Sequence, residues 1–226
     1  MTLRESLSTV LVAVAVLCAV AVAGTTVHRE FFPASDNRTD EPKPVPVANW
    51  KNFAVGHRFG PADAPVTIIE FADFECPVCR TFTLGPLQAI RDKYPTQVAV
   101  VFRHWPLRYH RFAYASARAA ECAGRQGKFE QFHDMIYLKQ DSIGLKPFED
   151  YAREVGVQDL PAFNSCNTAT SPIPSVEADK VAATSVGGSG TPTILINGLR
   201  LPGAPDSARL EQFVRAALLA SHAGPS

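Results

Sequence analysis

The chain has 226 residues and carries 22 basic and 22 acidic side chains. A hydrophobic share of 46% excludes a wholly disordered chain, and a formal charge of zero offers no field that would attract nucleic acid. This length suits one domain with additional segments.

The first segment of the chain is an uninterrupted apolar run. No charged residue occurs between residues 6 and 27, and roughly 20 apolar residues in a helix are enough to cross a membrane. We therefore predict that residues 1–28 form a single-pass membrane anchor, with the rest of the chain outside the cytoplasm, on the periplasmic or cell-surface side. The alternative is a signal sequence cleaved after Ala21-Val22-Ala23, which would release a secreted body. Within this run, Cys18 is expected to be a small apolar filler.

Residues 29–49 differ in composition from the segments on either side. Four prolines (Pro33, Pro42, Pro44 and Pro46) stand among polar and charged residues, a mixture that cannot bury apolar surface and favours polyproline II. We expect a semi-rigid linker here, followed by one domain over residues 50–221.

Beyond the linker, strand and helix patterns alternate. A β-rich run bounded by prolines predicts a buried strand over residues 65–71. A helix follows over residues 76–94, which Gly85-Pro86 should kink, and a second strand over residues 98–102. From residue 112 to about 186 the pattern is helical, with an amphipathic stripe formed by Phe129, Phe132, His133, Ile136 and Tyr137.

The C-terminal part predicts a hairpin and a final helix. Asn197-Gly198 joins two short apolar runs, residues 193–196 and 199–201, as a type I′ turn does. Asp206 is placed to cap a last helix, which would turn five apolar residues inward: Leu210, Phe213, Val214, Ala217 and Leu218. Strands separated by helices, with an antiparallel hairpin at the edge, predict an α/β fold.

The sequence Cys76-Pro77-Val78-Cys79 follows a predicted strand and opens a predicted helix. A zinc site would usually need a second pair of ligands, which the sequence does not offer, and a structural disulfide seldom closes so short a loop. A redox-active dithiol fits, because the N-terminus of a helix favours the thiolate form of the first sulfur. We expect Cys76 to be exposed and Cys79 to lie one turn inside.

Five segments of the body resemble the DsbA-like family of extracytoplasmic thiol-disulfide oxidoreductases, which have the thioredoxin fold. They are Gly-Pro-Ala-Asp-Ala-Pro-Val-Thr (60–67), Glu-Phe-Ala-Asp-Phe-Glu-Cys-Pro-Val-Cys (70–79), Phe-Arg-His-Trp-Pro-Leu (102–107), Gln-Gly-Lys-Phe (126–129) and Gly-Thr-Pro-Thr (190–193). The resemblance covers most of the chain beyond residue 49. It implies a thioredoxin fold with a helical insertion, here about residues 111–187.

The resemblance also implies roles for particular residues. A cis proline facing the dithiol falls on Pro192, with Thr191 before it, and the buried acid of the family falls on Glu70, whose alternative is a strand-end acid that reaches solvent. One departure is Val78, where the best-known strong oxidants carry His, so a strongly oxidising potential does not follow. Cys122 and Cys166 resemble a further cysteine pair of several relatives, and we predict that they form a structural disulfide; two separately buried thiols are the alternative.

Other polar residues are expected to have structural roles. Asp73 and Glu75, just before the helix, should act as cap and dipole partners. No pair among the histidines His104, His110 and His133 has a tight ligand spacing with a cysteine, and His133 should be a hydrogen-bonded interior residue. We therefore expect no metal site and no cofactor.

These features predict a membrane-anchored enzyme that forms disulfides in unfolded or reduced exported proteins. Cys76 would be the nucleophile and Cys79 the resolving cysteine, with Glu70 as proton acceptor and Thr191 and Pro192 beside the substrate. Oxidation would require a membrane redox partner, which we expect to be quinone-linked. Two alternatives remain open: a reductase or isomerase for a narrow client, and a metal-delivery module that uses the same dithiol.

Overall fold

A computed structural model describes residues 43–222 of the chain. The predicted anchor, Cys18 and most of the predicted linker lie outside these residues. Among the helices within the described range, none has the length and apolar character needed to cross a membrane.

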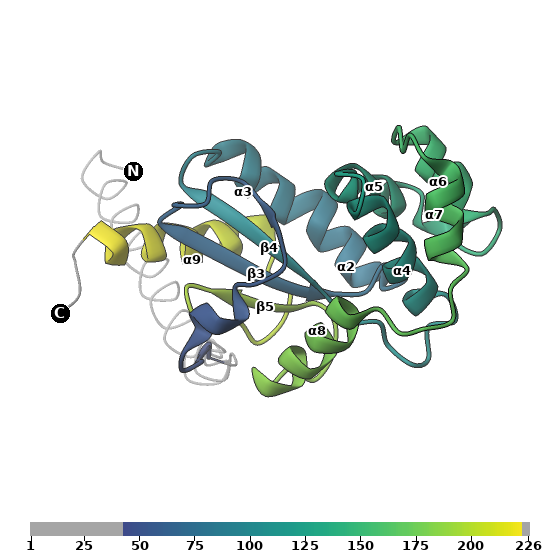
Figure 1. Ribbon diagram of the computed structural model, residues 1–226. Helices are drawn as coiled ribbons and strands as arrows, with labels where there is room; N and C mark the ends of the chain where they lie inside the picture. The colour runs from purple at the N-terminus through teal and green to yellow at the C-terminus, as the bar shows by residue number, and fades with distance from the viewer. Residues whose placement is uncertain (1–42, 223–226) are drawn as a thin grey trace, which may run out of the picture. The chain divides into compact units, whose positions relative to one another are not determined.

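A six-stranded mixed sheet forms the centre of the domain, with the order β1-β6-β5-β3-β4-β2 (Figure 1). The two longest strands, β3 (Val66–Ala72) and β4 (Val98–His104), run parallel in the middle, and β5 (Thr193–Ile196) pairs antiparallel with β3. Both central strands are buried along their whole length. β3 begins and ends one residue later than the strand predicted over residues 65–71, and β4 extends the strand predicted over residues 98–102 by two residues.

Short strands that the sequence did not predict complete the sheet at both edges. β2 (His57–Phe59) pairs antiparallel with β4 at one edge. At the other edge β1 (Val45–Pro46) pairs antiparallel with β6 (Leu199–Arg200), so the end of the segment that we expected to be linker is part of the sheet. A short 3₁₀ helix, η2 (Trp50–Phe53), follows β1.

The helix predicted over residues 76–94 is divided into three parts. α2 (Pro77–Phe82) continues through a π-helical turn, η3 (Thr83–Leu87), into α3 (Gln88–Lys93). Pro86 lies inside the π turn, and because proline has no backbone N–H, the regular α-helical hydrogen bonding cannot pass through it. The expected kink at Gly85-Pro86 is therefore present as a π turn.

All the helices between β4 and β5 belong to the predicted insertion. They are α4 (Ala113–Gly124), α5 (Phe129–Leu138), η4 (Gln140–Ser142), α6 (Phe148–Glu154), α7 (Leu160–Asn167) and α8 (Pro174–Ser185). The five residues of the predicted amphipathic stripe are all buried on α5. A disulfide between Cys122 and Cys166 joins α4 to α7, with 5.8 Å between the two Cα atoms.

The C-terminal hairpin and helix have the form that the sequence predicts. Asn197 and Gly198 both have positive φ angles, 44° and 88°, as a type I′ turn requires. α9 (Ser207–His222) follows, and the carboxylate of Asp206 accepts a hydrogen bond from the Arg209 N–H at 2.8 Å. Leu210 and Val214 of this helix are fully buried.

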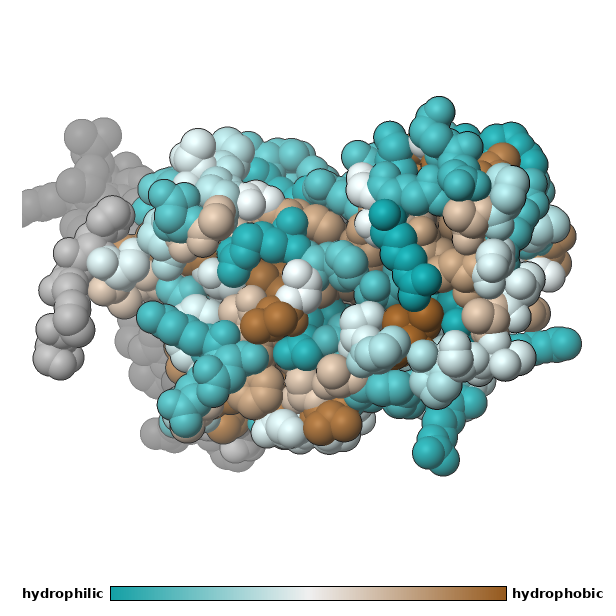
Figure 2. Space-filling model, viewed as in Figure 1, coloured by the Kyte–Doolittle hydropathy of each residue, from teal (hydrophilic) through white to brown (hydrophobic). Residues whose placement is uncertain are grey.

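The strands have apolar side chains on both faces, and helices cover each face. Val66 and Ile68 of β3 pack in one cluster with residues of α2, α3, α5 and α9. Ile69 and Phe71 point the other way and pack against α8 and Trp50. Figure 1 shows α2 and α3 on one side of the sheet and α8 on the other, and Figure 2, from the same side, shows hydrophilic side chains over much of the insertion.

Candidate active site

Cys76 lies at the junction where the chain leaves β3 and enters α2. It is the N-cap residue of the helix, with Pro77 in the first turn, and its sulfur accepts a hydrogen bond from the Cys79 N–H at 3.4 Å. Cys76 and Cys79 are free thiols in this structure. The strand-to-helix junction predicted for this motif is confirmed, and the sulfur itself caps the helix.

The surroundings of Cys76 favour its thiolate form. Its pKa is lowered to about 6, chiefly because the Cys79 thiol donates a hydrogen bond to its sulfur. Partial burial acts in the opposite direction, and the backbone N–H groups of Val78 and Cys79 add to the lowering. At neutral pH the sulfur is therefore largely ionised, the form that attacks disulfides and leaves from them.

Cys79 has the opposite character. It is fully buried, and burial raises its pKa well above the ordinary value, with the hydrogen bond to Cys76 and the charges of Cys76 and Glu70 acting in the same direction. Cys76 is itself only 5% exposed, so the prediction that its side chain is exposed was wrong. The loop that contains Thr191 lies over it, and the Cys76 sulfur lies 3.4 Å from the Thr191 carbonyl oxygen, to which it donates a hydrogen bond in its neutral thiol form.

Thr191 and Pro192 precede β5, beside the dithiol. The peptide bond between them is cis, as the resemblance implied. The Thr191 carbonyl contacts the Cys76 sulfur, and the Thr193 hydroxyl donates to the Gly190 carbonyl at 2.7 Å, within the same loop. The sequence therefore identified the segment that lies next to the reactive sulfur.

Glu70 is a buried acid on β3, fully shielded from solvent. One carboxyl oxygen accepts a hydrogen bond from the Thr83 hydroxyl at 3.1 Å, and the other has no hydrogen-bond partner among the residues that the structure describes. Burial raises the pKa of Glu70 to about 8, and the Thr83 hydrogen bond only partly offsets this. The acid is therefore neutral at pH 7, and the alternative that it reaches solvent is wrong.

The helical insertion holds the loop that precedes the dithiol. The side-chain amide of Gln140, on η4, donates to the carbonyl oxygens of Phe74 at 2.8 Å and Cys76 at 3.0 Å. Tyr137 donates to the Asp73 carbonyl at 3.4 Å. Sequence reasoning missed Gln140, because a polar residue after a predicted helix gives no signal of which distant carbonyls it will meet.

Asp73 and Glu75 do not cap α2, contrary to the sequence prediction. Asp73 accepts hydrogen bonds from the backbone N–H groups of Glu75 and Leu107, and its Oδ2 lies 2.8 Å from Nδ1 of His110. Glu75 accepts from the Phe112 N–H. Both carboxylates thus join the dithiol loop to the segment that follows β4.

Two further sequence predictions concern the interior of the insertion. The disulfide expected between Cys122 and Cys166 is present. His133 is buried as expected, and its Nδ1 lies 2.8 Å from the Asp134 carboxylate, while its Nε2 has no partner within residues 43–222. Burial lowers the pKa of His133, so the ring is neutral at pH 7.

The sequence matches known proteins over most of the described domain. The thioredoxin family model matches residues 53–216. Among curated proteins, a Na⁺/H⁺ antiporter NhaA 3 of Salinispora tropica is 34% identical over 170 residues, which are 75% of this chain and 26% of that protein. An NhaA antiporter of Herminiimonas arsenicoxydans is 33% identical over 170 residues, which are again 75% of this chain and 26% of that protein. The chain thus spans about a quarter of the length of these relatives.

Solved structures show the same fold. A thioredoxin-like oxidoreductase from Silicibacter pomeroyi is 29% identical, with a TM-score of 0.59, over 72% of this chain and 92% of that one. BdbD from Bacillus subtilis has a TM-score of 0.65 at 20% identity, and the match covers 79% of this chain and 97% of that one. Alpha-DsbA1 of Wolbachia pipientis has a TM-score of 0.59 at 22% sequence identity, and the match covers 72% of this chain and 92% of that one. The chain therefore belongs to the thioredoxin family, and its fold is shared with DsbA-like structures.

Proposed function

We propose that this chain oxidises pairs of thiols in exported, unfolded or reduced proteins. The observation that carries the proposal is the pKa of Cys76, lowered to about 6 beside a Cys79 whose pKa is raised. A stabilised Cys76 thiolate favours the reduced form of the dithiol. A dithiol whose reduced form is favoured accepts electrons readily, so it acts as an oxidant.

The reaction begins with Cys76 and Cys79 joined in a disulfide. A client thiolate attacks the Cys76 sulfur, the disulfide breaks, and the electron pair of that bond stays on Cys79. The second client thiolate then attacks the client sulfur of the mixed disulfide and expels Cys76 as its stable thiolate. The client loses two electrons and the dithiol gains two, which a membrane redox partner, quinone-linked in our proposal, would remove.

Glu70 is suited to the proton transfer that accompanies the first step. The departing Cys79 sulfur is buried and its pKa is high, so it must take up a proton. Glu70, with its pKa of about 8 and a carboxyl oxygen free of hydrogen bonds, is protonated at neutral pH and can supply it. In the reverse direction the Glu70 carboxylate would accept the proton from Cys79.

Thr191 and Pro192 would hold the client beside the reactive sulfur. The contact between Cys76 and the Thr191 carbonyl places backbone groups of this loop next to Sγ. An extended client chain can be bound through such backbone groups with little dependence on its sequence, as strand addition does. We place this reaction outside the cytoplasm, with residues 1–28 as the membrane anchor.

The redox equilibrium of the full chain with glutathione tests the direction of transfer. An oxidant is expected, with a potential between that of thioredoxin, about −270 mV, and that of the strongest oxidants of the superfamily, about −120 mV, because the pKa of Cys76 is lowered only to about 6. A potential near about −270 mV would instead support the reductase alternative.

The side chain of Val78 favours the reductase alternative. Its side chain is 53% exposed beside the dithiol, and it has no polar group that could donate to the Cys76 thiolate. Val78→His should therefore raise the potential, since an imidazole at this position can donate to the sulfur; Val78→Leu is the matched control. An unchanged potential in Val78→His would show that this position does not set the direction.

A further inference from the structure

A cluster of three metal-ligating side chains lies outside the dithiol site. His57 is on β2, His104 is at the end of β4 and Glu121 is on α4, and one ligand atom of each lies within 4.8 Å of the others. The three residues come from three elements that are distant in sequence. The cluster therefore joins the edge of the sheet to the first helix of the insertion.

Both imidazoles direct the same atom toward a single carboxylate oxygen. Nε2 of His57 lies 2.8 Å from Oε1 of Glu121, and Nε2 of His104 lies 3.1 Å from the same oxygen. In a tetrahedral zinc site with bonds of about 2.0–2.1 Å, ligand atoms are separated by roughly 3.3 Å. Each of the two nitrogen–oxygen distances is within about half an ångström of that spacing.

Aromatic packing holds both histidine rings in place. The His104 ring makes edge contacts with Phe74, Phe102 and Phe129, and the His57 ring is stacked on Phe129. Rings fixed in this way are oriented before a metal arrives, which lowers the cost of binding.

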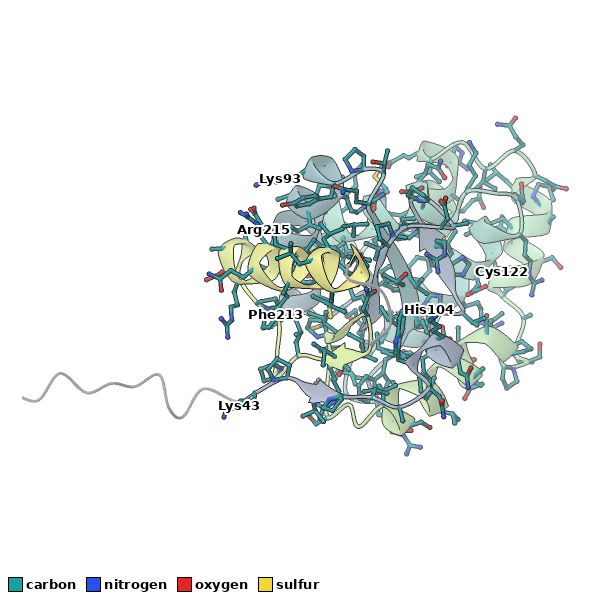
Figure 3. The ribbon with its side chains drawn as sticks, turned by 90° about the vertical axis from the view of Figure 1, so that its left-hand side faces the viewer. Lys43, Lys93, His104, Cys122, Phe213 and Arg215 are labelled. Carbon is teal, nitrogen blue, oxygen red and sulfur yellow. A yellow bond between two sulfur atoms is a disulfide. The ribbon has the colours of Figure 1, made fainter. Side chains whose placement is uncertain are left out.

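The cluster is accessible from one side. The His104 side chain is 1% exposed, whereas that of His57 is 28% exposed. A cation can therefore enter past His57, and solvent can reach the remaining coordination position. Figure 3 labels His104, together with Cys122, the residue next to Glu121.

We propose that His57, His104 and Glu121 bind one Zn²⁺ ion and that this ion links β2 and β4 to α4. Two imidazole nitrogens and one carboxylate oxygen are a zinc ligand set, with water in the fourth position. The site is separate in its ligands from Cys76 and Cys79, so it does not depend on the proposed oxidation of client thiols. Its predicted role is to stabilise the junction between sheet and insertion.

Zinc binding by the full chain tests the proposal, with Cys76 and Cys79 oxidised to a disulfide so that they cannot serve as ligands. Zn²⁺ is titrated in competition with a chromogenic chelator, and one ion per chain is expected. His57→Ala and Glu121→Gln should each weaken binding about tenfold or more. His110→Ala is the matched control, because His110 is also a partly exposed histidine paired with a carboxylate, and it should bind zinc as the unmodified chain does.

Two further measurements make the result decisive. Zn²⁺ should raise the melting temperature of the unmodified chain and not that of His57→Ala, whose fold is checked by circular dichroism. Co²⁺ in place of zinc should give the visible spectrum of a nitrogen and oxygen site without a thiolate charge-transfer band. The proposal is overturned if the oxidised chain binds no zinc, or if His57→Ala binds it as tightly as the unmodified chain; the carboxylate would then simply accept two hydrogen bonds.

Discussion

Cys76 and Cys79 are the same residue type three positions apart, yet their surroundings move their pKa values in opposite directions. The difference follows from the helix: the first sulfur lies before it and receives N–H groups, while the second is inside the first turn and faces the core. A hydrogen bond from the neutral thiol to the ionised sulfur increases the difference. One local conformation thus gives two neighbouring thiols of opposite acidity.

The hydrogen bond from the Cys79 thiol is the largest single cause of the lowered Cys76 pKa. Cys79→Ala removes that donor, so the Cys76 pKa should rise from about 6 toward its ordinary value of 9.0. Cys79→Ser keeps a donor in place and should raise it less. The rate of alkylation against pH measures both variants. A pKa that stays near 6 in both variants would mean that the backbone N–H groups alone stabilise the thiolate.

Glu70 makes the stability of the reduced protein depend on pH. Its folded pKa of about 8 exceeds the ordinary value of 4.5, so between these values the folded state holds a proton that the unfolded state has lost. Glu70 is therefore expected to lower the free energy of unfolding as pH rises through this window, by at most ~1.4 kcal/mol per pH unit, and above about pH 6 the lowered pKa of Cys76 acts in the opposite direction.

Glu70→Gln should remove the contribution of Glu70 to the pH dependence, because the amide does not titrate, so the free energy of unfolding of the variant should fall less, or rise, between pH 5 and 8. Urea unfolding between pH 5 and 8 measures this pH dependence. Glu154→Gln is the control, because the pKa of the exposed Glu154 carboxyl is lowered and this group is fully ionised throughout the window. Glu70→Gln should also slow the exchange reaction by about 10²-fold if Glu70 transfers the proton. A variant with the wild-type slope would show that Glu70 is ionised in the folded protein.

At the scale of elements, the sequence predicts those helices and turns that depend on local features, such as the spacing of apolar residues or a particular pair of turn residues. The buried face of α5 follows from spacing alone, and Asn197-Gly198 specifies the hairpin. β1 and β2 were missed because strands of two and three residues are too short to show alternation. Their formation depends on the open edges of β6 and β4, which only the assembled sheet provides.

The same limit applies to the sites. The dithiol lies within four consecutive residues, so a motif reveals it, and the resemblance placed Pro192 beside it. The cluster of His57, His104 and Glu121 spans three elements, and the histidine spacing in sequence led us to expect no metal there. Contacts made only by the packing of distant elements leave no pattern in a single sequence.

The disulfide between α4 and α7 stabilises the insertion. It joins residues 44 positions apart, and on the chain-entropy model a loop of that length contributes about 4 kcal/mol. The double variant Cys122→Ala/Cys166→Ala should therefore lower the free energy of unfolding by roughly 2–4 kcal/mol in urea. The alkylation profile of Cys76 should be unchanged, because neither residue contacts the dithiol; an altered profile would indicate that the insertion shifts the active-site loop.

At the scale of the whole molecule, the compact unit begins at Lys43 rather than at Trp50. β1 pairs with β6, and the Val47 N–H donates to the Gly198 carbonyl at 2.8 Å, directly on the hairpin turn. Gly198 also allows the close approach of Trp50, since a Cβ at this position would lie 2.3 Å from the Trp50 ring. The segment before Trp50 therefore covers one edge of the sheet.

This boundary can be tested by truncation. A chain that begins at Lys43 should unfold in urea with the same midpoint as the full chain, because it keeps every strand of the described sheet. One that begins at Trp50 loses β1 and leaves β6 as an open edge, so its free energy of unfolding should fall by about 1–2 kcal/mol for the lost backbone hydrogen bonds. Both truncated chains should keep the low pKa of Cys76. The hairpin that β1 covers contacts the start of β3, where the Thr67 N–H donates to Asn197, whereas the dithiol follows the other end of β3. Equal stability of the two truncated chains would restore the boundary that the composition suggested.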